Sequence, residues 1–172
     1  MRKIHTAILM LLLAGCADST RLIKENAENS SLSKDSSFYV SIPEDGIYGI
    51  KPYPGSGKMT SLIIKSSLSE ISRKVAIGNR TETLASALNS TRTGGYDYLV
   101  IPTILHWEDR ATEWNFMRDK IKVKIEFVDA FSGNVESSAI VEGKSGIATL
   151  GGDHPQDLLP EPIIEYLTNT LN

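Results

Sequence analysis

Apolar and polar positions follow two different periods along the chain. Between residues 119 and 130 apolar residues alternate with charged ones, and this period of two predicts a strand with one buried and one solvated face. Between Ile64 and Val75 apolar residues recur at steps of four, three and four, which predicts an amphipathic helix. The chain therefore combines strands and helices.

Other segments fit the same two patterns. Further strands are predicted at Phe38–Ile42, at 75–77, along the apolar stretch 96–109 despite its unfavourable Pro102, and at 135–142. A turn at Ser132, Gly133 and Asn134 joins the last two strands as a hairpin. Further helices are predicted from a cap at Thr81 to Gly94 and Gly95, and over residues 162–171 with Pro160 and Pro162 near the first turn.

The predicted order is β-α-β-α-β-β-β-α, a single α/β (α+β) domain over residues 38–172 with helices packed on a mixed five-stranded sheet. This order, and the turn "DAFSGNV" from Asp129 to Val135, resemble the periplasmic α/β module of the TolB amino-terminal domain and the curli lipoprotein CsgG. The stretches "YPGSGKMT", "ILHWEDRATEW" and "GGDHPQDLLP" more closely resemble a family of small bacterial envelope lipoproteins of unknown function. That resemblance implies no activity.

Residues 1–15 have the pattern of an export signal. Arg2 and Lys3 precede an uncharged apolar block that is far shorter than the roughly 20 residues of a membrane-spanning helix. Leu13, Ala14, Gly15 and Cys16 match the lipobox of bacterial lipoproteins. This resemblance implies cleavage before Cys16 and a covalent diacylglycerol and acyl lipid on that residue. The alternative is an unmodified cysteine that only packs as a small hydrophobe.

In such lipoproteins an Asp directly after the cysteine commonly retains the protein in the inner membrane. Ala17 occupies that position, which favours the periplasmic face of the outer membrane, with the inner membrane as the alternative. Residues 16–37 are predicted as the lipidated cysteine and a flexible tether, because Ser, Asn and charged residues dominate there. A short helix around Leu22 to Ala27 is the alternative.

Charge and cysteine content narrow the set of partners. Removal of Arg2 and Lys3 from the 18 basic residues leaves 16 against 21 acidic ones, a net charge of −5. This balance argues against a nucleic-acid partner. Cys16 is the only cysteine, so no disulfide is expected, and no cofactor beyond the lipid is predicted.

Three predicted loops, 43–58, 107–119 and 146–156, converge on one edge of the sheet if its first three strands are parallel. Ligands of open α/β sheets bind at such an edge, outside the carboxyl ends of the strands. The candidate partner-binding residues there are Tyr53, Trp107, Glu108, Asp109, Arg110, Glu113, Trp114, Asp153 and His154.

Several motifs on these loops allow a catalytic or ligand-binding interpretation. The stretch "GSGK", residues 55–58, is not a P-loop, because Pro52 and Met59 occupy the positions where a P-loop has Gly and Ser or Thr. No nucleotide is therefore expected. Free amides at the start of the following helix could still accept an anion. The loop carboxylates could act as acids and bases or bind calcium, but the interleaved Arg110 and Arg118 favour an ion-paired turn. These carboxylates are Glu108, Asp109, Glu113 and Asp119. His106 and His154 alone make a weak zinc site, so no metal is predicted.

An aromatic cluster surrounds the 107–119 loop and consists of Trp107, Trp114, Phe116 and Met117. Tryptophan is enriched at binding hot spots, so the cluster could contact a partner, or it could fold inward as core.

Two hypotheses follow. The first is a non-catalytic lipoprotein that binds, assembles or scaffolds envelope components through the three loops, with the membrane, an envelope protein or further copies of itself as partners. The alternative is a periplasmic hydrolase or other enzyme that uses carboxylate and His residues of the 107–119 and 146–157 loops. An enzyme should place Glu108, Asp109 and His154 within hydrogen-bond reach in a cleft. A binding module should show a flatter aromatic patch.

Overall fold

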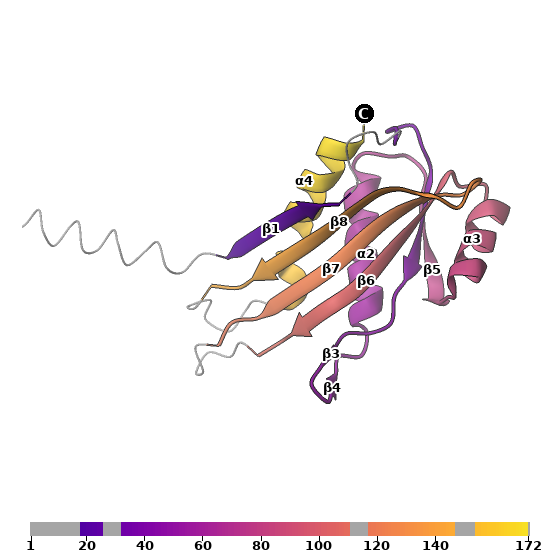
Figure 1. Cartoon of the computed structure of the whole chain (residues 1–172). Helices are drawn as coiled ribbons and strands as arrows, with labels where there is room; N and C mark the ends of the chain where they lie inside the picture. Colours follow the sequence, from indigo (N-terminus) through magenta and orange to yellow (C-terminus); the bar gives the residue numbers. More distant parts are fainter. Residues whose placement is uncertain (1–17, 26–31, 111–116, 147–153, 172) are drawn as a thin grey trace, which may run out of the picture.

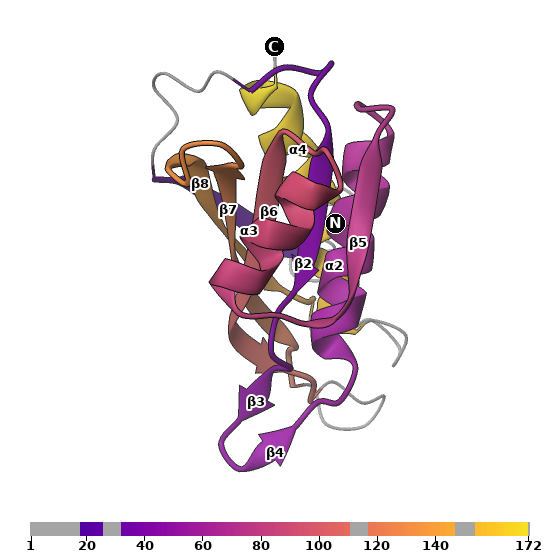
Figure 2. The ribbon, with the colours of Figure 1, turned by 90° about the vertical axis from the view of Figure 1, so that its right-hand side faces the viewer.

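The computed structural model describes residues 18–25, 32–110, 117–146 and 154–171. A six-stranded sheet forms the centre of the fold (Figure 1). Helices α2 (Ser56–Ser69) and α4 (Pro160–Thr170), with the short 3-10 helix η1 (Pro155–Leu158), cover one face of the sheet. Helix α3 (Leu84–Thr93) packs on part of the other face (Figure 2). The predicted class, one α+β domain with helices on a mixed sheet, is confirmed.

The strand order of the sheet is β1-β8-β7-β6-β2-β5. The strands are β1 (Ser19–Lys24), β2 (Phe38–Ile42), β5 (Val75–Thr81), β6 (Tyr98–Glu108), β7 (Lys120–Asp129) and β8 (Val135–Lys144). β2 pairs in parallel with β5 and β6, as predicted, and β7, β8 and β1 extend the sheet by antiparallel pairs. A separate hairpin of β3 (Ile47–Tyr48) and β4 (Lys51–Pro52) projects beside the end of β6 (Figure 1).

The prediction of five strands is wrong, because β1 adds a sixth. The residues of β1 lie in the segment predicted as a flexible tether, with a short helix as the alternative. They form neither of these but a β-strand. β1 pairs with β8 along its whole length, from Ser19 opposite Lys144 to Lys24 opposite Ala139. Leu22 packs against the main core, so the strand gains apolar burial together with its ladder of hydrogen bonds.

The predicted first helix is present as α2, but its boundaries differ. It begins at Ser56 and ends at Ser69, so Val75 belongs to β5 instead. Its first turns face the sheet with small polar residues, and the Ser61 hydroxyl donates a hydrogen bond to the Ser41 carbonyl oxygen at 2.8 Å. The apolar stripe in the sequence therefore marks only the second half of the helix.

The other two helices lie close to their predicted positions. Thr83, and not Thr81, caps α3, since Thr83 Oγ1 accepts a hydrogen bond from the Ser86 amide at 3.3 Å. Gly94 ends this helix as predicted. α4 starts at Pro160, so both of its prolines occupy the first turn, where their missing N–H groups are tolerated.

Two strand features also match their predictions. Pro102 lies within β6 but past Val100, the last residue of β6 that pairs with β2, so one side of the strand has no ladder to interrupt. Gly133 takes a φ of 77° in the turn between β7 and β8, a conformation that glycine adopts without strain.

The main core lies between the sheet and helices α2 and α4. Phe38 and Phe127 pack edge to face at 5.8 Å between ring centroids, and Tyr166 of α4 lies 6.0 Å from Phe127. Among the helices of the described ranges, none is long and apolar enough to span a bilayer.

Candidate functional site

The loops after β2, β6 and β8 lie at the same end of the sheet, as the parallel strands predict (Figure 1). All three loops contribute to the lining of a common cavity of about 390 Å³, for example through Tyr53, Asp109 and Gln156. The Tyr53 hydroxyl donates to the Asp109 carbonyl oxygen at 3.3 Å and accepts from the Asp109 amide at 3.4 Å. We call this joined surface the three-loop edge.

Glu108 is the centre of an ion-pair network at this edge, and its side chain is only 3% exposed. Arg110 Nη1 donates to its Oε1 at 2.7 Å, and Lys120 Nζ donates to its Oε2 at 3.1 Å. His106 Nε2 lies 3.2 Å from the same Oε2. The prediction of an ion-paired turn is therefore confirmed for Glu108 and Arg110.

The pKa of Glu108 reports the balance of burial against these contacts. Burial is the largest single influence and raises the pKa, but the hydrogen bonds from Lys120, His106 and Arg110 together outweigh it. The net result is a pKa below the ordinary value for glutamate. The carboxylate is therefore negative at neutral pH and stays bound to its cationic neighbours.

A bulge in β6 determines which side chains reach this network. The register shifts between Ile104 and His106, so Leu105 is one residue more than the ladder with β7 needs. Because side chains alternate between faces, an extra residue reverses the facing of everything after it. His106 and Glu108 consequently lie opposite Lys122 and Lys120.

The same bulge turns Trp107 inward. Its side chain belongs to the main core and is 3% exposed, so it does not contact a partner, and the core alternative for this residue is the correct one. Gly46 lies against it, since a Cβ atom at Gly46 would be 2.5 Å from Trp107 Cβ. The close approach of the loop after β2 to β6 therefore requires glycine at position 46.

Tyr48 of β3 belongs to this site and is not among the residues predicted for it. Its hydroxyl accepts a hydrogen bond from Arg110 Nη1 at 3.2 Å, and its ring packs edge to face on His106 with 5.5 Å between centroids. Tyr48 thereby fastens the β3–β4 hairpin to the end of β6. No sequence motif marks it, because the contact depends on the position of the hairpin in space.

Asp109 and His154 lie close together without forming a hydrogen bond. His154 Nδ1 is 3.6 Å from Asp109 Oδ2, and both side chains are at least one-third exposed. Glu108 has a separate set of partners, which are His106, Arg110 and Lys120. The arrangement expected of an enzyme, with Glu108, Asp109 and His154 in mutual hydrogen-bond reach, is not formed by these three residues.

The start of α2 is not available to an anion. Asp45 Oδ2 accepts from the Gly55 amide at 3.0 Å, and Oδ1 accepts from the Gly57 amide at 2.8 Å. A carboxylate of the protein itself therefore binds the amides that an anion would need, which overturns the anion-binding interpretation of "GSGK".

The predicted site residues are only partly within the described ranges. Cys16, Glu113, Trp114 and Asp153 lie outside them, as does Phe116 of the aromatic cluster. Met117 is 43% exposed and its sulfur accepts from Arg110 Nη2 at 2.8 Å. Among the described residues, no group of three or more His, Cys, Asp and Glu side chains is placed to hold a metal ion.

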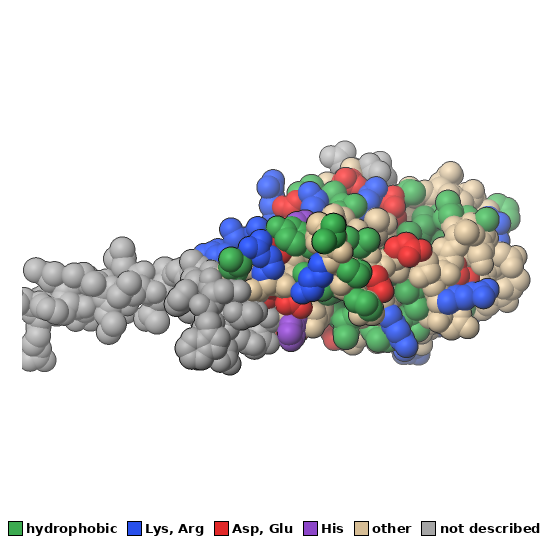
Figure 3. Space-filling model, turned by 90° about the horizontal axis from the view of Figure 1, so that it is seen from below, with side chains coloured by type: hydrophobic (Ala, Val, Ile, Leu, Met, Phe, Trp, Pro, Cys, Tyr) green, Lys and Arg blue, Asp and Glu red, His purple; other side chains and the backbone are tan. Residues whose placement is uncertain are grey.

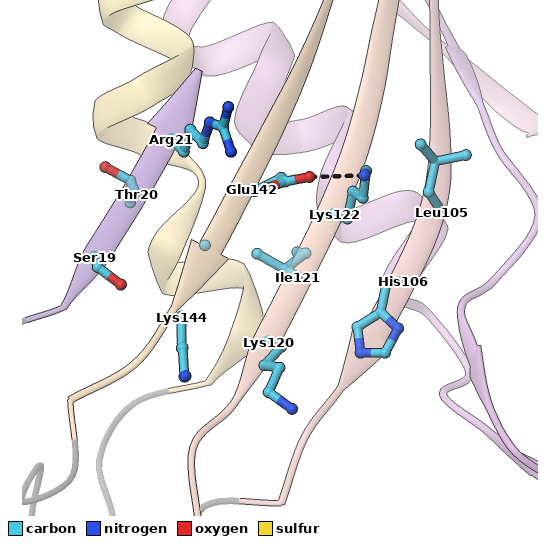
Figure 4. A pocket seen from close by; sticks show the side chains of 11 residues that line it. Ser19, Thr20, Arg21, Leu105, His106, Lys120, Ile121, Lys122, Glu142 and Lys144 are labelled. Atoms are coloured by element: carbon cyan, nitrogen blue, oxygen red, sulfur yellow. Dashed lines mark ion pairs between the residues drawn. The ribbon is translucent and has the colours of Figure 1, made fainter. Parts of the chain in front are cut away.

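A second cavity, of about 540 Å³, opens on the outer face of β1, β8, β7 and β6 (Figure 4). Its charged lining consists of Arg21, Lys120, Lys122, Lys144 and Glu142, with His106 beside them. Lys122 pairs with Glu142 at 2.7 Å. The cavity is therefore predominantly basic in a chain whose net charge is −3.

The model of a protein family, a domain of unknown function designated DUF4823, matches residues 30–170. The chain belongs to this family. No curated protein matches this DUF4823 chain. The family expectation from the sequence is thus confirmed at the level of a family of unknown function, while the resemblance to TolB and CsgG stays a prediction.

Several solved structures are similar to this DUF4823 protein, and the first two named here support its fold. PelC from Paraburkholderia phytofirmans, solved as a dodecamer, is 16% identical, with 90% of this chain and 99% of that chain covered and a TM-score of 0.67. Protein XCC0632 from Xanthomonas campestris, described as DUF330, is 10% identical, and the match covers 83% of this chain and 86% of that chain with a TM-score of 0.51. Lipoprotein GNA1162 from Neisseria meningitidis is 15% identical, and the match covers 78% of this chain and 99% of that chain with a TM-score of 0.47.

Proposed function

We propose that this DUF4823 protein is a lipid-anchored, non-catalytic assembly or scaffolding factor of the bacterial cell envelope that works as a homo-oligomer. The observation that carries the proposal is the state of Glu108. This buried carboxylate of the three-loop edge is bound by Arg110, Lys120 and His106, and it lines neither of the two cavities described above. A carboxylate that is 3% exposed and whose pKa is lowered by such contacts is a poor general acid at neutral pH, and it serves instead to stabilise the protein.

The fold supports the oligomeric part of the proposal. The PelC structure is a dodecamer, and the similarity covers 99% of its chain, so a protomer of this fold can build a dodecamer. The part of the outer sheet face beyond α3 carries half-exposed Ile23 and Ile140 next to ion-paired Lys124 and Glu126. A mixed surface of this kind suits contact between copies.

The lipobox sequence supports the anchor. Cys16 with its lipid would hold the protein on a membrane, and Ala17 after it favours the periplasmic face of the outer membrane over the inner membrane. Two or more acyl chains on one residue are sufficient for stable anchoring.

The test combines lipid analysis with a measurement of mass in solution. Mass spectrometry of protein purified from membranes should find the lipid on Cys16, and the Cys16→Ser variant should carry no lipid, because it has no thiol to which the lipid could be attached. Native mass spectrometry in detergent should find a homo-oligomer. An unmodified Cys16 in protein released without detergent would refute the anchor, and a monomer at every concentration would refute the assembly.

One observation favours the enzymatic alternative, namely the Asp109 and His154 pair beside the 390 Å³ cavity. If the protein is a hydrolase, Asp109→Asn and His154→Gln should each abolish turnover of a test ester or glycoside. Tyr53→Phe alters the same cavity without removing a charge, so this variant should keep most of the turnover. Turnover by the unaltered protein that follows this pattern would replace the scaffold proposal.

A further inference from the structure

The position of β1 ties the start of the folded domain to one end of the sheet. Ser19 is the first residue of β1, and it lies opposite Lys144, the last residue of β8. Lys144 in turn lies opposite Lys120, the first residue of β7. Asp18 continues this attachment, since its Oδ1 accepts from the Gly146 amide at 2.8 Å.

This arrangement leaves very little chain between Cys16 and the sheet. Three residue steps separate Cys16 from Ser19, and an extended chain covers at most about 10 Å in three steps. If Cys16 carries lipid, this end of the sheet must lie against the bilayer surface. A long tether would allow any orientation, whereas so short a link permits few.

The end that would face the bilayer is basic. Lys120 of β7 and Lys144 of β8 point toward this end of the sheet (Figure 4). Arg21 and Lys122 lie farther from the end along β1 and β7 (Figure 4). Figure 3 shows Lys and Arg side chains gathered at the end of the molecule where β1 begins. Within the described residues, neither Lys144 nor Arg21 has a carboxylate within ion-pair distance, although Arg21 lies opposite Glu142 in the β1–β8 ladder and is attracted to it at longer range. Neither cation is therefore held in an ion pair of the fold.

The same end also carries exposed apolar side chains. Ile47 is 63% exposed and Ile50 fully exposed on the β3–β4 hairpin, which Tyr48 fastens to Arg110 and His106. Apolar side chains next to cations are the composition that peripheral proteins bring to the head-group region of a membrane. Full exposure of an isoleucine is otherwise unfavourable in water.

We propose that this anchor-end face, made of Arg21, Lys120, Lys122, Lys144 and the hairpin residues Ile47 and Ile50, binds the head groups of anionic phospholipids. It thereby fixes the strands of the sheet at a steep angle to the membrane. The proposal rests on the lipid anchor proposed above. Charge complementarity selects the occupant, because phosphate-bearing head groups supply anions to Lys144 and Arg21, which form no ion pair with the described residues.

The experiment uses the full-length lipoprotein in vesicles of phosphatidylcholine with phosphatidylglycerol, and in vesicles of phosphatidylcholine alone. Rates of lysine acetylation are measured by mass spectrometry, and the lipid on Cys16 is measured in the same samples. We expect acetylation of Lys120 and Lys144 to slow about fivefold in the anionic vesicles, the effect expected for about one lysine contact with a charged surface. Lys34, exposed at the opposite end of the sheet, should react equally in both. High salt should remove the difference.

Two double variants make the test specific. Arg21→Gln with Lys144→Gln removes the cations without an ion pair, and we expect the protection of Lys120 to fall at least threefold. The matched control, Lys34→Gln with Arg73→Gln, removes two exposed cations at the opposite end and should leave that protection unchanged. The circular dichroism spectrum checks that both variants are folded.

The outcomes separate the two proposals. If Cys16 carries no lipid, the proposed function fails whatever the lysines do. If Cys16 is lipidated and Lys120 and Lys144 react equally in both kinds of vesicle, the anchor stands and the head-group proposal is overturned. If Lys120 and Lys144 are acetylated equally slowly in both kinds of vesicle and in detergent, the head-group proposal is also overturned. A second copy of the chain would then cover this face.

Discussion

Glu108 keeps a negative charge inside the protein because its three partners come from both sides of the β6–β7 connection. His106 and Arg110 flank it in sequence, whereas Lys120 reaches it from the neighbouring strand. The side chains of the partners are 37% to 47% exposed, so the network joins a buried anion to solvated cations. It thus closes the end of the sheet without burying an unpaired charge.

Replacement of this anion should destabilise the fold. In Glu108→Gln the amide can accept only part of the hydrogen bonds, and Arg110 and Lys120 would repel each other. We expect the free energy of unfolding in urea to fall by about 2 kcal/mol, the typical loss for a charged hydrogen bond. Glu142→Gln is the control, since Glu142 is one-third exposed and forms one ion pair among the described residues, with Lys122, and it should lose less than about 1 kcal/mol. Equal losses in the two variants would contradict a structural role for Glu108.

Asp97 leads to a prediction about pH at the opposite end of the sheet. Its Oδ2 accepts from the Ser37 hydroxyl and from the Ser37 amide, each at 2.7 Å, and these bonds lower the pKa of Asp97 below its ordinary value of 3.8. A carboxylate with a lowered pKa contributes stability that is fully present above pH 3.8 and lost as the pH falls through the folded-state pKa.

The stability difference between the unaltered protein and Asp97→Asn should therefore be largest near pH 7 and shrink below about pH 4. Urea unfolding at several pH values measures this difference. Asp35→Asn, at an exposed carboxylate outside the Ser37 contact, is the control. A difference between the unaltered protein and Asp97→Asn that stays constant down to pH 3 would show that the Ser37 hydrogen bonds do not depend on the charge.

At the scale of elements, the β3–β4 hairpin depends on how closely its loop approaches β6. The Gly46 amide donates to Ser56 Oγ at 2.8 Å, and the Gly46 carbonyl oxygen accepts from the Tyr53 amide at 2.9 Å. Trp107 fills the space where a side chain at position 46 would point. The hairpin, the start of α2 and the end of β6 therefore share one packed junction.

Gly46→Ala should disrupt this junction. The new methyl group would meet Trp107 at 2.5 Å, so either the loop or the tryptophan must move, and we expect a loss of about 1–3 kcal/mol in the free energy of unfolding. Trp107 fluorescence should shift to the red as the ring becomes more exposed. Gly49→Asn in the same hairpin is the control, since no atom lies near that position and Asn tolerates its φ of 61°. An unchanged emission maximum in Gly46→Ala would contradict the packing of the loop on Trp107.

The elements also show what local sequence can and cannot reveal. β7 was predictable because one-sided burial imposes a period of two on Ile121, Val123 and Ile125. β1 was not, since its six residues include only Leu22 and Ile23 as apolar positions, and its strand conformation depends on pairing with the distant β8. At the site, parallel strands predicted the meeting of three loops. The facing of Trp107 was unpredictable, because it depends on a bulge at Leu105 that no residue pattern marks.

For the whole molecule, the two ends of the sheet differ in what they offer. The end where β1 begins carries the basic cavity and the exposed hairpin, while the end with Phe38 and Asp129 carries tight turns and the start of β2. The short link to Cys16 converts this difference into an orientation, provided that the cysteine is lipidated. A longer link would keep the anchor and lose the orientation.

Insertion of ten Gly and Ser residues between Ala17 and Asp18 tests this dependence. A flexible insert of that length adds roughly 15–20 Å of root-mean-square reach, enough to let the domain turn away from the bilayer. We expect an unchanged free energy of unfolding, since Asp18 and β1 keep their contacts, and unchanged lipid on Cys16. Acetylation of Lys144 in anionic vesicles should rise toward its rate in phosphatidylcholine alone, because the longer link no longer holds this face against the head groups. Full protection despite the insert would mean that the face binds head groups strongly enough to orient the domain without the short link.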